Sequence, residues 1–156
     1  MMIVFFTVAF AAQAVPPGEE PVEPYTQSDA NAGATPFRGA GMLRAFHGRT
    51  GINRMTDDFV DRLLADKRIT DIFKSQDIVR LRRLLKEQFC YILNGGCAYT
   101  GRTMKASHNN LGIQEADMGA LVEDLQAAMR KEKIGFFEQN RFLAKLAPIK
   151  REAVQR

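Results

Sequence analysis

Residues 95–113 read GGCAYTGRTMKASHNNLGI and separate two long apolar-patterned segments of the chain. A connection between packed helices usually takes ~2–8 residues, so the length of this one indicates a functional segment. It contains His108, one of only two histidines, among short polar residues. If residues 104–110 form a helical turn, the Nδ1–H of His108 can donate to the Met104 carbonyl, which leaves Nε2 for a metal ion. Taken alone, a single histidine is more typical of a surface or core position than of a metal ligand.

Four apolar stripes on either side of this segment predict an all-α chain. In each stripe, apolar residues recur at intervals of three or four, which is the spacing of one face of an amphipathic helix. Asp77 is the expected N-cap of the second helix, and residues 94–96 (Asn-Gly-Gly) are expected to end it because they tolerate positive φ. The stripes comprise Ile52, Met55, Phe59 and Leu63; Ile78, Leu81, Leu85, Phe89 and Ile92; Met118, Leu121, Leu125 and Met129; and Phe142, Leu146, Ile149 and Ala153.

The composition indicates one folded domain that carries excess positive charge. Apolar residues make up 46% of the 156 positions and charged residues 26%, which is enough apolar surface for a core. With two cysteines and two histidines, a disulfide-dense scaffold and a zinc-finger cage are excluded. No apolar run approaches the ~18–20 residues of a membrane-spanning helix.

The first 41 residues differ in character from the rest of the chain. Residues 1–14, MMIVFFTVAFAAQA, have no charged side chain and end in an A-x-A pattern, which predicts a signal peptide and a periplasmic or secreted protein. A mis-assigned start codon or an ordinary terminus is the alternative. Residues 15–41 hold five of the six prolines and a net charge of −3, so we expect a flexible linker. The domain would then span residues 42–156.

From Asp57 onward the chain resembles the truncated haemoglobins, the two-over-two α-helical globins, and among them most closely the first group. The resemblance covers roughly residues 42–156 and needs at most a one-residue shift near residues 95–96. It predicts an all-α two-over-two globin fold. The matching residues are Asp58-Phe59, Leu64-Ala65-Asp66, Phe73, Arg80-Leu81, Gly95-Gly96, Tyr99-Thr100-Gly101, Met104-Lys105, His108 and Gly112-Ile113.

The resemblance implies a haem b cofactor whose iron is held by His108, the position of the family's proximal ligand. Phe73 corresponds to a phenylalanine that packs flat on the porphyrin, and Met104 would cover the proximal face. Arg80 and Tyr99 match positions near the haem propionates, where a guanidinium and a phenol can pair with carboxylates. A solvent-exposed helix face is an equally good reading of Arg80.

The positions that face the gas ligand depart from the family pattern. Val60 stands where the first group has a tyrosine that donates a hydrogen bond to the ligand. Leu81 and Leu85 occupy the two facing positions of the second long helix, and the latter is frequently a glutamine. These substitutions predict a distal pocket without a donor, with weaker oxygen retention and easier access for NO or CO. Gln88 is the remaining candidate donor if it turns inward.

Three side chains are left with open assignments. Cys90 and Cys97 form either a disulfide, if the chain folds back at residues 95–96, or two free thiols. His47 is expected to be a surface residue rather than a sixth ligand.

The resemblance implies reversible binding of a diatomic gas, with a function in oxygen binding and transport or NO handling. NO dioxygenation or electron transfer would in addition require a redox partner. The basic clusters at residues 80–86 and 130–133 are read as solvated helix faces without a nucleic-acid docking motif. The alternative function is that of a haemless basic helical module for a partner protein or nucleic acid.

Overall fold

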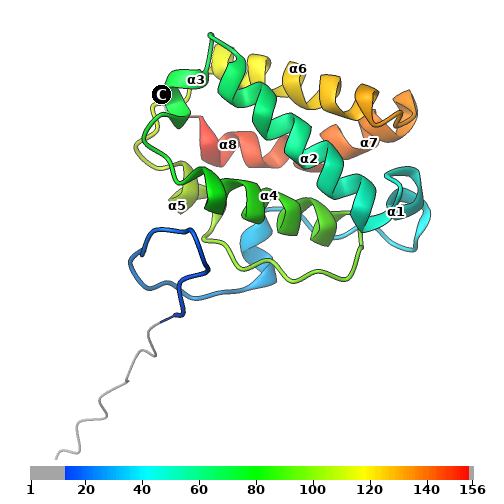
Figure 1. Ribbon diagram of the computed structural model, residues 1–156. Helices are drawn as coiled ribbons and strands as arrows, with labels where there is room; N and C mark the ends of the chain where they lie inside the picture. The colour runs from blue at the N-terminus through cyan, green and yellow to red at the C-terminus, as the bar shows by residue number, and fades with distance from the viewer. Residues whose placement is uncertain (1–12, 155–156) are drawn as a thin grey trace, which may run out of the picture.

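The computed structural model describes residues 13–154, and every regular element within them is helical (Figure 1). Helix α2 packs against both α4 and α6, and α6 contacts α7. The all-α prediction is confirmed. The long helices are α2 (Gly48–Ala65), α4 (Ile78–Ile92), α6 (Glu115–Lys131) and α7 (Phe136–Leu146). The short ones are η1 (Asp29–Ala32), α1 (Gly41–Ala45), α3 (Thr70–Phe73), α5 (Met104–His108), η2 (Ala147–Ile149) and α8 (Lys150–Ala153).

The predicted stripes supply most of the core. The α2 stripe is buried along its whole length, and Phe89 of α4 packs edge-on against Phe142 of α7 with ring centroids 5.1 Å apart. Phe46 meets Phe142 at the same distance. Edge-to-face aromatic pairs stabilise a core beyond the area they bury. Phe89 is therefore a packing residue between α4 and α7.

The ends of α4 follow the expected local chemistry. A carboxylate oxygen of Asp77 accepts a hydrogen bond from the backbone N–H of Arg80 at 2.9 Å, which caps the N-terminus. At the other end Asn94 and Gly96 have φ values of 62° and 75°. Side chains with a branched β-carbon would be strained there, so these residues are what allow the chain to reverse direction.

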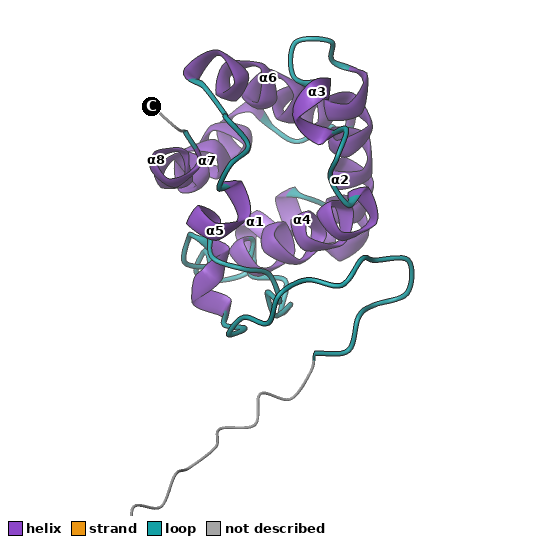
Figure 2. Cartoon of the chain, turned by 90° about the vertical axis from the view of Figure 1, so that its left-hand side faces the viewer, coloured by secondary structure: helices purple, strands orange, loops and turns teal. Residues whose placement is uncertain are grey.

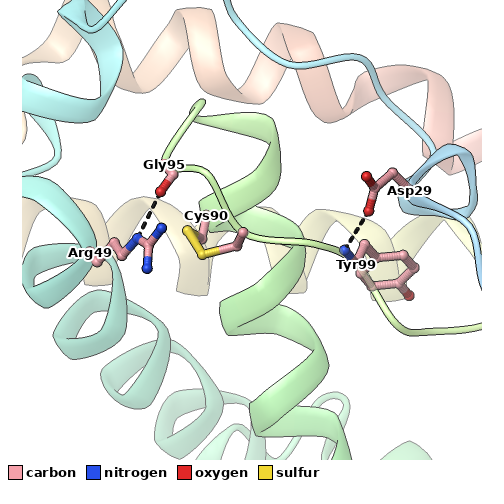
Figure 3. Close-up of a disulfide and its surroundings, with 6 residues drawn as sticks. Asp29, Arg49, Cys90, Gly95 and Tyr99 are labelled. Atoms are coloured by element: carbon pink, nitrogen blue, oxygen red, sulfur yellow. Dashed lines mark hydrogen bonds between the residues drawn. A yellow bond between two sulfur atoms is a disulfide. The ribbon is translucent and has the colours of Figure 1, made fainter.

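The reversal brings Cys97 back onto α4. Cys90 and Cys97 form a disulfide with their Cα atoms 5.7 Å apart (Figure 3). Beside it, the Nε of Arg49 on α2 donates to the Gly95 carbonyl at 2.7 Å. Of the two possibilities for these cysteines, the structure has the disulfide, and it fixes the start of the connection that leads to α5.

Residues 15–41, for which the sequence predicts a flexible linker, are described throughout and lie against the folded domain. Residues 13–40, which we call the N-terminal strap, lie along α4 and the 97–103 connection (Figure 1). The Glu20 N–H donates to Asp77 Oδ2 at 2.8 Å, and the Phe37 N–H donates to the Ile92 carbonyl at 2.8 Å. Composition indicated a linker because the segment has little apolar surface to bury. Its polar groups are instead satisfied by the folded domain.

Residues 1–12 lie outside the described residues, and the signal peptide predicted for residues 1–14 stays a prediction. Within the part of the chain that is described, no helix is both long and apolar enough to cross a bilayer.

Candidate functional site

His108 is the last residue of α5, and its ring is fixed by its own helix. The Thr103 hydroxyl caps the N-terminus of α5 by accepting from the Ala106 N–H at 3.2 Å. One turn later, His108 Nδ1 lies 2.7 Å from the Met104 carbonyl oxygen. A carbonyl oxygen only accepts, so Nδ1 carries the hydrogen and Nε2 carries the lone pair of the neutral ring. The hydrogen bond predicted from the sequence is confirmed.

Apolar side chains on the helices around α5 are only partly buried. Figure 2 shows α3, α4, α5 and α6 arranged in a ring. Phe73 on α3 and both Leu81 and Leu85 on α4 are half-buried, as are Met118 and Leu121 on α6. Leucine and phenylalanine at core-facing positions are usually covered completely. An imidazole with its lone pair on Nε2, among apolar side chains that are not fully covered, is a donor set that fits haem.

The side of the site formed by α2 and α4, which we call the distal side, contains no side-chain donor at the predicted positions. Val60 is fully buried on α2, and Leu81 and Leu85 are half-buried on α4. Thr56, Gln88 and Gln139 are polar residues that are buried as a whole. Each donates to a backbone carbonyl, at 2.8, 2.8 and 2.9 Å respectively.

Gln88 points to the other side of α4. Its Nε2 donates to the Ala32 carbonyl at 2.8 Å and lies 3.2 Å from the Met104 sulfur. The side chain is 6% exposed, so turning it toward Leu81 and Leu85 would break a buried hydrogen bond. In this arrangement the amide belongs to the α5 side of the site, which we call the proximal side, and we do not propose it as a distal donor.

Arg80 is held by the N-terminal strap. Its Nε lies 3.1 Å from Glu19 Oε2, and Arg83 contacts the other oxygen of the same carboxylate. The Glu19 side chain is 1% exposed, and the hydrogen bond from Arg83 is the largest cause of its lowered pKa. The Glu19 carboxylate therefore binds the Arg80 guanidinium, which the family resemblance predicts to bind a haem propionate. The propionate role of Arg80 stays a prediction.

Tyr99 lies beneath the strap rather than at the surface. Tyr99 is 4% exposed, and its side chain packs with Ala32 and Met104 in a small core. Burial raises the pKa of the phenol to about 12, so it is protonated at neutral pH. The hydroxyl is 3.4 Å from the Arg102 carbonyl oxygen, to which it donates. Its predicted contact with a propionate stays a prediction.

The basic residues of α4 are paired with carboxylates. Arg82 contacts Asp57 and Asp61, Lys86 contacts Asp57 at 2.8 Å, and Arg83 contacts Glu87 at 2.7 Å. Such pairing neutralises the cluster as a surface for phosphates. His47 is likewise a surface residue, with its Nδ1 3.1 Å from Glu132 Oε1 and a side chain that is 45% exposed.

Comparison with known proteins decides the family. A family model described as bacterial-like globin matches residues 43–155. The chain belongs to this family. Globins bind diatomic gases at haem, so membership implies haem-based gas binding and favours that function over a haemless module.

Relatives of this bacterial-like globin are truncated haemoglobins. It is 31% identical to the group 1 truncated hemoglobin GlbN of Synechocystis over 88 residues, 54% of this chain and 71% of the relative. It is 27% identical to GlbN of Mycolicibacterium paratuberculosis over 65% of this chain and 75% of the relative. The crystal structure of the Tetrahymena pyriformis truncated hemoglobin superimposes with a TM-score of 0.70 at 18% identity, covering 74% of this chain and 98% of that one. The two-over-two globin fold is therefore confirmed.

Sequence reasoning missed the strap contacts on the proximal side. Ala32, Gly33 and Glu19 lie in a segment without helical or strand periodicity, and nothing in their spacing marks them. The reason is physical, because each acts through contacts with distant residues rather than through a repeating pattern.

Proposed function

We propose that this globin holds haem b through Nε2 of His108 and binds diatomic gases reversibly. The observation that carries the proposal is the 2.7 Å hydrogen bond from His108 Nδ1 to the Met104 carbonyl. It selects the tautomer that a metal ion needs and restrains the ring's rotation. When haem is bound, its iron supplies the site for the gas.

The chain's own residues shape the rest of the site. Phe73, Leu81 and Leu85 exclude water from the porphyrin, and Met104 covers the proximal face beside His108. Arg80 and Tyr99 are proposed partners of the propionates, in which case Arg80 would be shared with Glu19. These side chains lie on α3, α4, α5 and the connection between α4 and α5.

The donor-free distal side favours rapid oxygen release and NO or CO binding over oxygen storage. A hydrogen bond to a ligand with partial negative charge is charge-assisted, and Val60, Leu81 and Leu85 cannot supply one. We accordingly propose NO handling or short-lived oxygen binding. A catalytic role such as NO dioxygenation would require a reductant and therefore a redox partner.

We also propose that the protein is exported to the periplasm or secreted. The disulfide between Cys90 and Cys97 supports an oxidising compartment, in agreement with the apolar residues 1–14 of the sequence. Mass spectrometry of the protein from its native cell, before and after reduction, tests both the bond and the cleavage. A disulfide-bonded mass that begins near residue 15 is the expected result, and a reduced, uncleaved chain would contradict it.

Titration with hemin tests the proposed function. The wild-type chain should bind one equivalent and develop a Soret band, and His108→Ala should lose the band or bind with a changed spectrum. His47→Ala, which removes the exposed histidine, is the matched control and should titrate like the wild type. An unchanged spectrum in His108→Ala, or a wild-type chain that stays colourless, would refute the proposal.

A further inference from the structure

The N-terminal strap lies outside the family match, yet it contacts the segment that carries His108. Family similarity begins at residue 43, whereas the strap ends at residue 40. Three of its side chains contact the connection before α5, from Tyr99 to Gly101. The Tyr25 hydroxyl donates to the Thr100 carbonyl at 2.6 Å, and Asn31 Nδ2 donates to the Gly101 carbonyl at 3.1 Å. Asp29 accepts from the Tyr99 N–H at 2.8 Å (Figure 3).

The strap also packs directly on Met104. Gly33 adopts φ +78°, and a β-carbon placed on it would lie 2.5 Å from Met104 Cγ and 3.0 Å from Ile149 Cγ1. No side chain fits at that distance, so Met104 and the strap backbone are in close contact. Ala32, the preceding residue, is fully buried in the same small core.

Gln88 joins the strap to Met104 from the side of α4. Its Nε2 donates to the Ala32 carbonyl at 2.8 Å and lies 3.2 Å from Met104 Sδ. Because the amide is buried, its removal would leave a buried carbonyl without a donor. Met104 is therefore held on two sides, by Gly33 and by Gln88, and its carbonyl accepts the hydrogen bond from His108.

We infer that the N-terminal strap is a positioning element for the haem ligand. Gly33 and Gln88 fix Met104, and the Met104 carbonyl fixes the tautomer and orientation of the His108 ring. This inference rests on the proposed role of His108 as the haem ligand. It assigns to residues 13–40 a function that the globin domain alone does not contain, and it makes Gly33 and Gln88 positioning residues rather than residues that touch haem.

Two pairs of matched variants test the inference. Gly33→Ala introduces a β-carbon against Met104, whereas Gly39→Ala introduces one at φ +68° with nothing within 4 Å, so both share the backbone strain. Gln88→Leu removes the donor between Ala32 and Met104. Gln139→Leu removes an equally buried amide, 6% exposed, whose acceptor is the Ile134 carbonyl.

The first measurement uses the full-length chain without haem. The ¹⁵N chemical shifts of the His108 ring report the ratio of its Nδ1–H to its Nε2–H tautomer, and a general loss of stability without displacement of Met104 would not change this ratio. Gly33→Ala and Gln88→Leu should lower the ratio about tenfold, and Gly39→Ala and Gln139→Leu should leave it at the wild-type value. Equal ratios within each pair would overturn the inference.

The second measurement uses the haem-loaded chain and follows transfer of haem to an excess of a scavenging protein. Gly33→Ala and Gln88→Leu should lose haem about tenfold faster than their controls, and equal rates within both pairs would overturn the inference. If the wild type does not ligate haem through His108, the proposed function fails while the tautomer ratio still decides the role of the strap. If the wild type ligates haem and the pairs do not differ, only the inference fails.

Discussion

The proximal and distal sides of the site differ in the kind of contact that their side chains make. On the proximal side, a chain of contacts runs from the strap through Gln88 and Met104 to His108. On the distal side, Val60, Leu81 and Leu85 bring only apolar surface. A hydrogen-bonded network specifies one geometry, whereas apolar contacts allow small rearrangements at low cost. With haem bound at His108 as proposed, the site would hold its iron ligand closely and its gas ligand only by shape.

The ion pair that docks the strap should give the largest effect. Glu19→Gln leaves two arginines without their buried carboxylate, a loss of about 3 kcal/mol that would open the strap about 100-fold more often. Hydrogen exchange of amides in residues 15–37 measures this opening. Glu20→Gln, which alters the neighbouring exposed carboxylate and leaves its backbone contacts in place, should exchange like the wild type.

The pH dependence of strap docking follows from the lowered pKa of Glu19. A carboxylate with a lowered pKa in the folded chain stabilises it above its ordinary pKa, and that contribution disappears as the pH falls through the lowered value. Wild-type protection of the strap should therefore decline in acid, and the Glu19→Gln variant should lack this component. Identical acid profiles for the two proteins would show that Glu19 does not dock the strap.

The disulfide should affect global stability and leave the distal side unchanged. It closes a short loop, and by the chain-entropy relation its loss costs about 2.5 kcal/mol. Unfolding of haem-loaded Cys90→Ser/Cys97→Ser in urea should show this decrease, while the oxygen dissociation rate stays at the wild-type value. An unchanged midpoint would contradict the structural role of the bond, and a changed oxygen rate would couple it to the distal side.

A donor added to the distal side should change ligand kinetics without affecting haem retention. Leu85→Gln is close to isosteric and places an amide on the face of α4 that carries Leu81. A charge-assisted hydrogen bond contributes about 1.5–3 kcal/mol, so oxygen dissociation should slow by about tenfold to a hundredfold. Leu84→Gln changes the adjacent half-buried leucine, which packs toward Tyr99 and the strap, and should leave the rate unchanged. A wild-type rate in Leu85→Gln would contradict the assignment of the distal side.

A carboxyl group on α6 with one buried oxygen should give the smallest effect, and with the opposite sign. Asp124 Oδ2 is buried without a hydrogen-bond partner among the described residues, and burial is the first cause of its raised pKa, followed by the charge of Asp66. A raised carboxyl pKa reduces stability as the pH rises through it. Asp124→Asn should therefore stabilise the chain at neutral pH by up to about 1 kcal/mol and lose that advantage in acid. Destabilisation at neutral pH in thermal unfolding would contradict this account.

Periodic features of the sequence predicted the helices, whereas His108 became the candidate ligand only through the resemblance to the truncated haemoglobins. The stripe from Ile52 to Leu63 is the buried face of α2, and the turn at His108 has the hydrogen bond that its spacing allowed. The partner of Gln88 was not predictable, because a buried amide has the same local sequence signal whichever way it turns. The strap contacts could not be predicted because composition reports only the apolar surface that a segment can bury by itself, while Glu19 and Asn31 bind polar groups on the folded domain.

The account depends on a bond between iron and His108, and the resonance Raman spectrum of the ferrous, ligand-free protein reports that bond directly. An iron–histidine stretching band should be present in the wild type and in His47→Ala, and absent in His108→Ala. A band that persists in His108→Ala, or its absence from a haem-loaded wild type, would contradict the account.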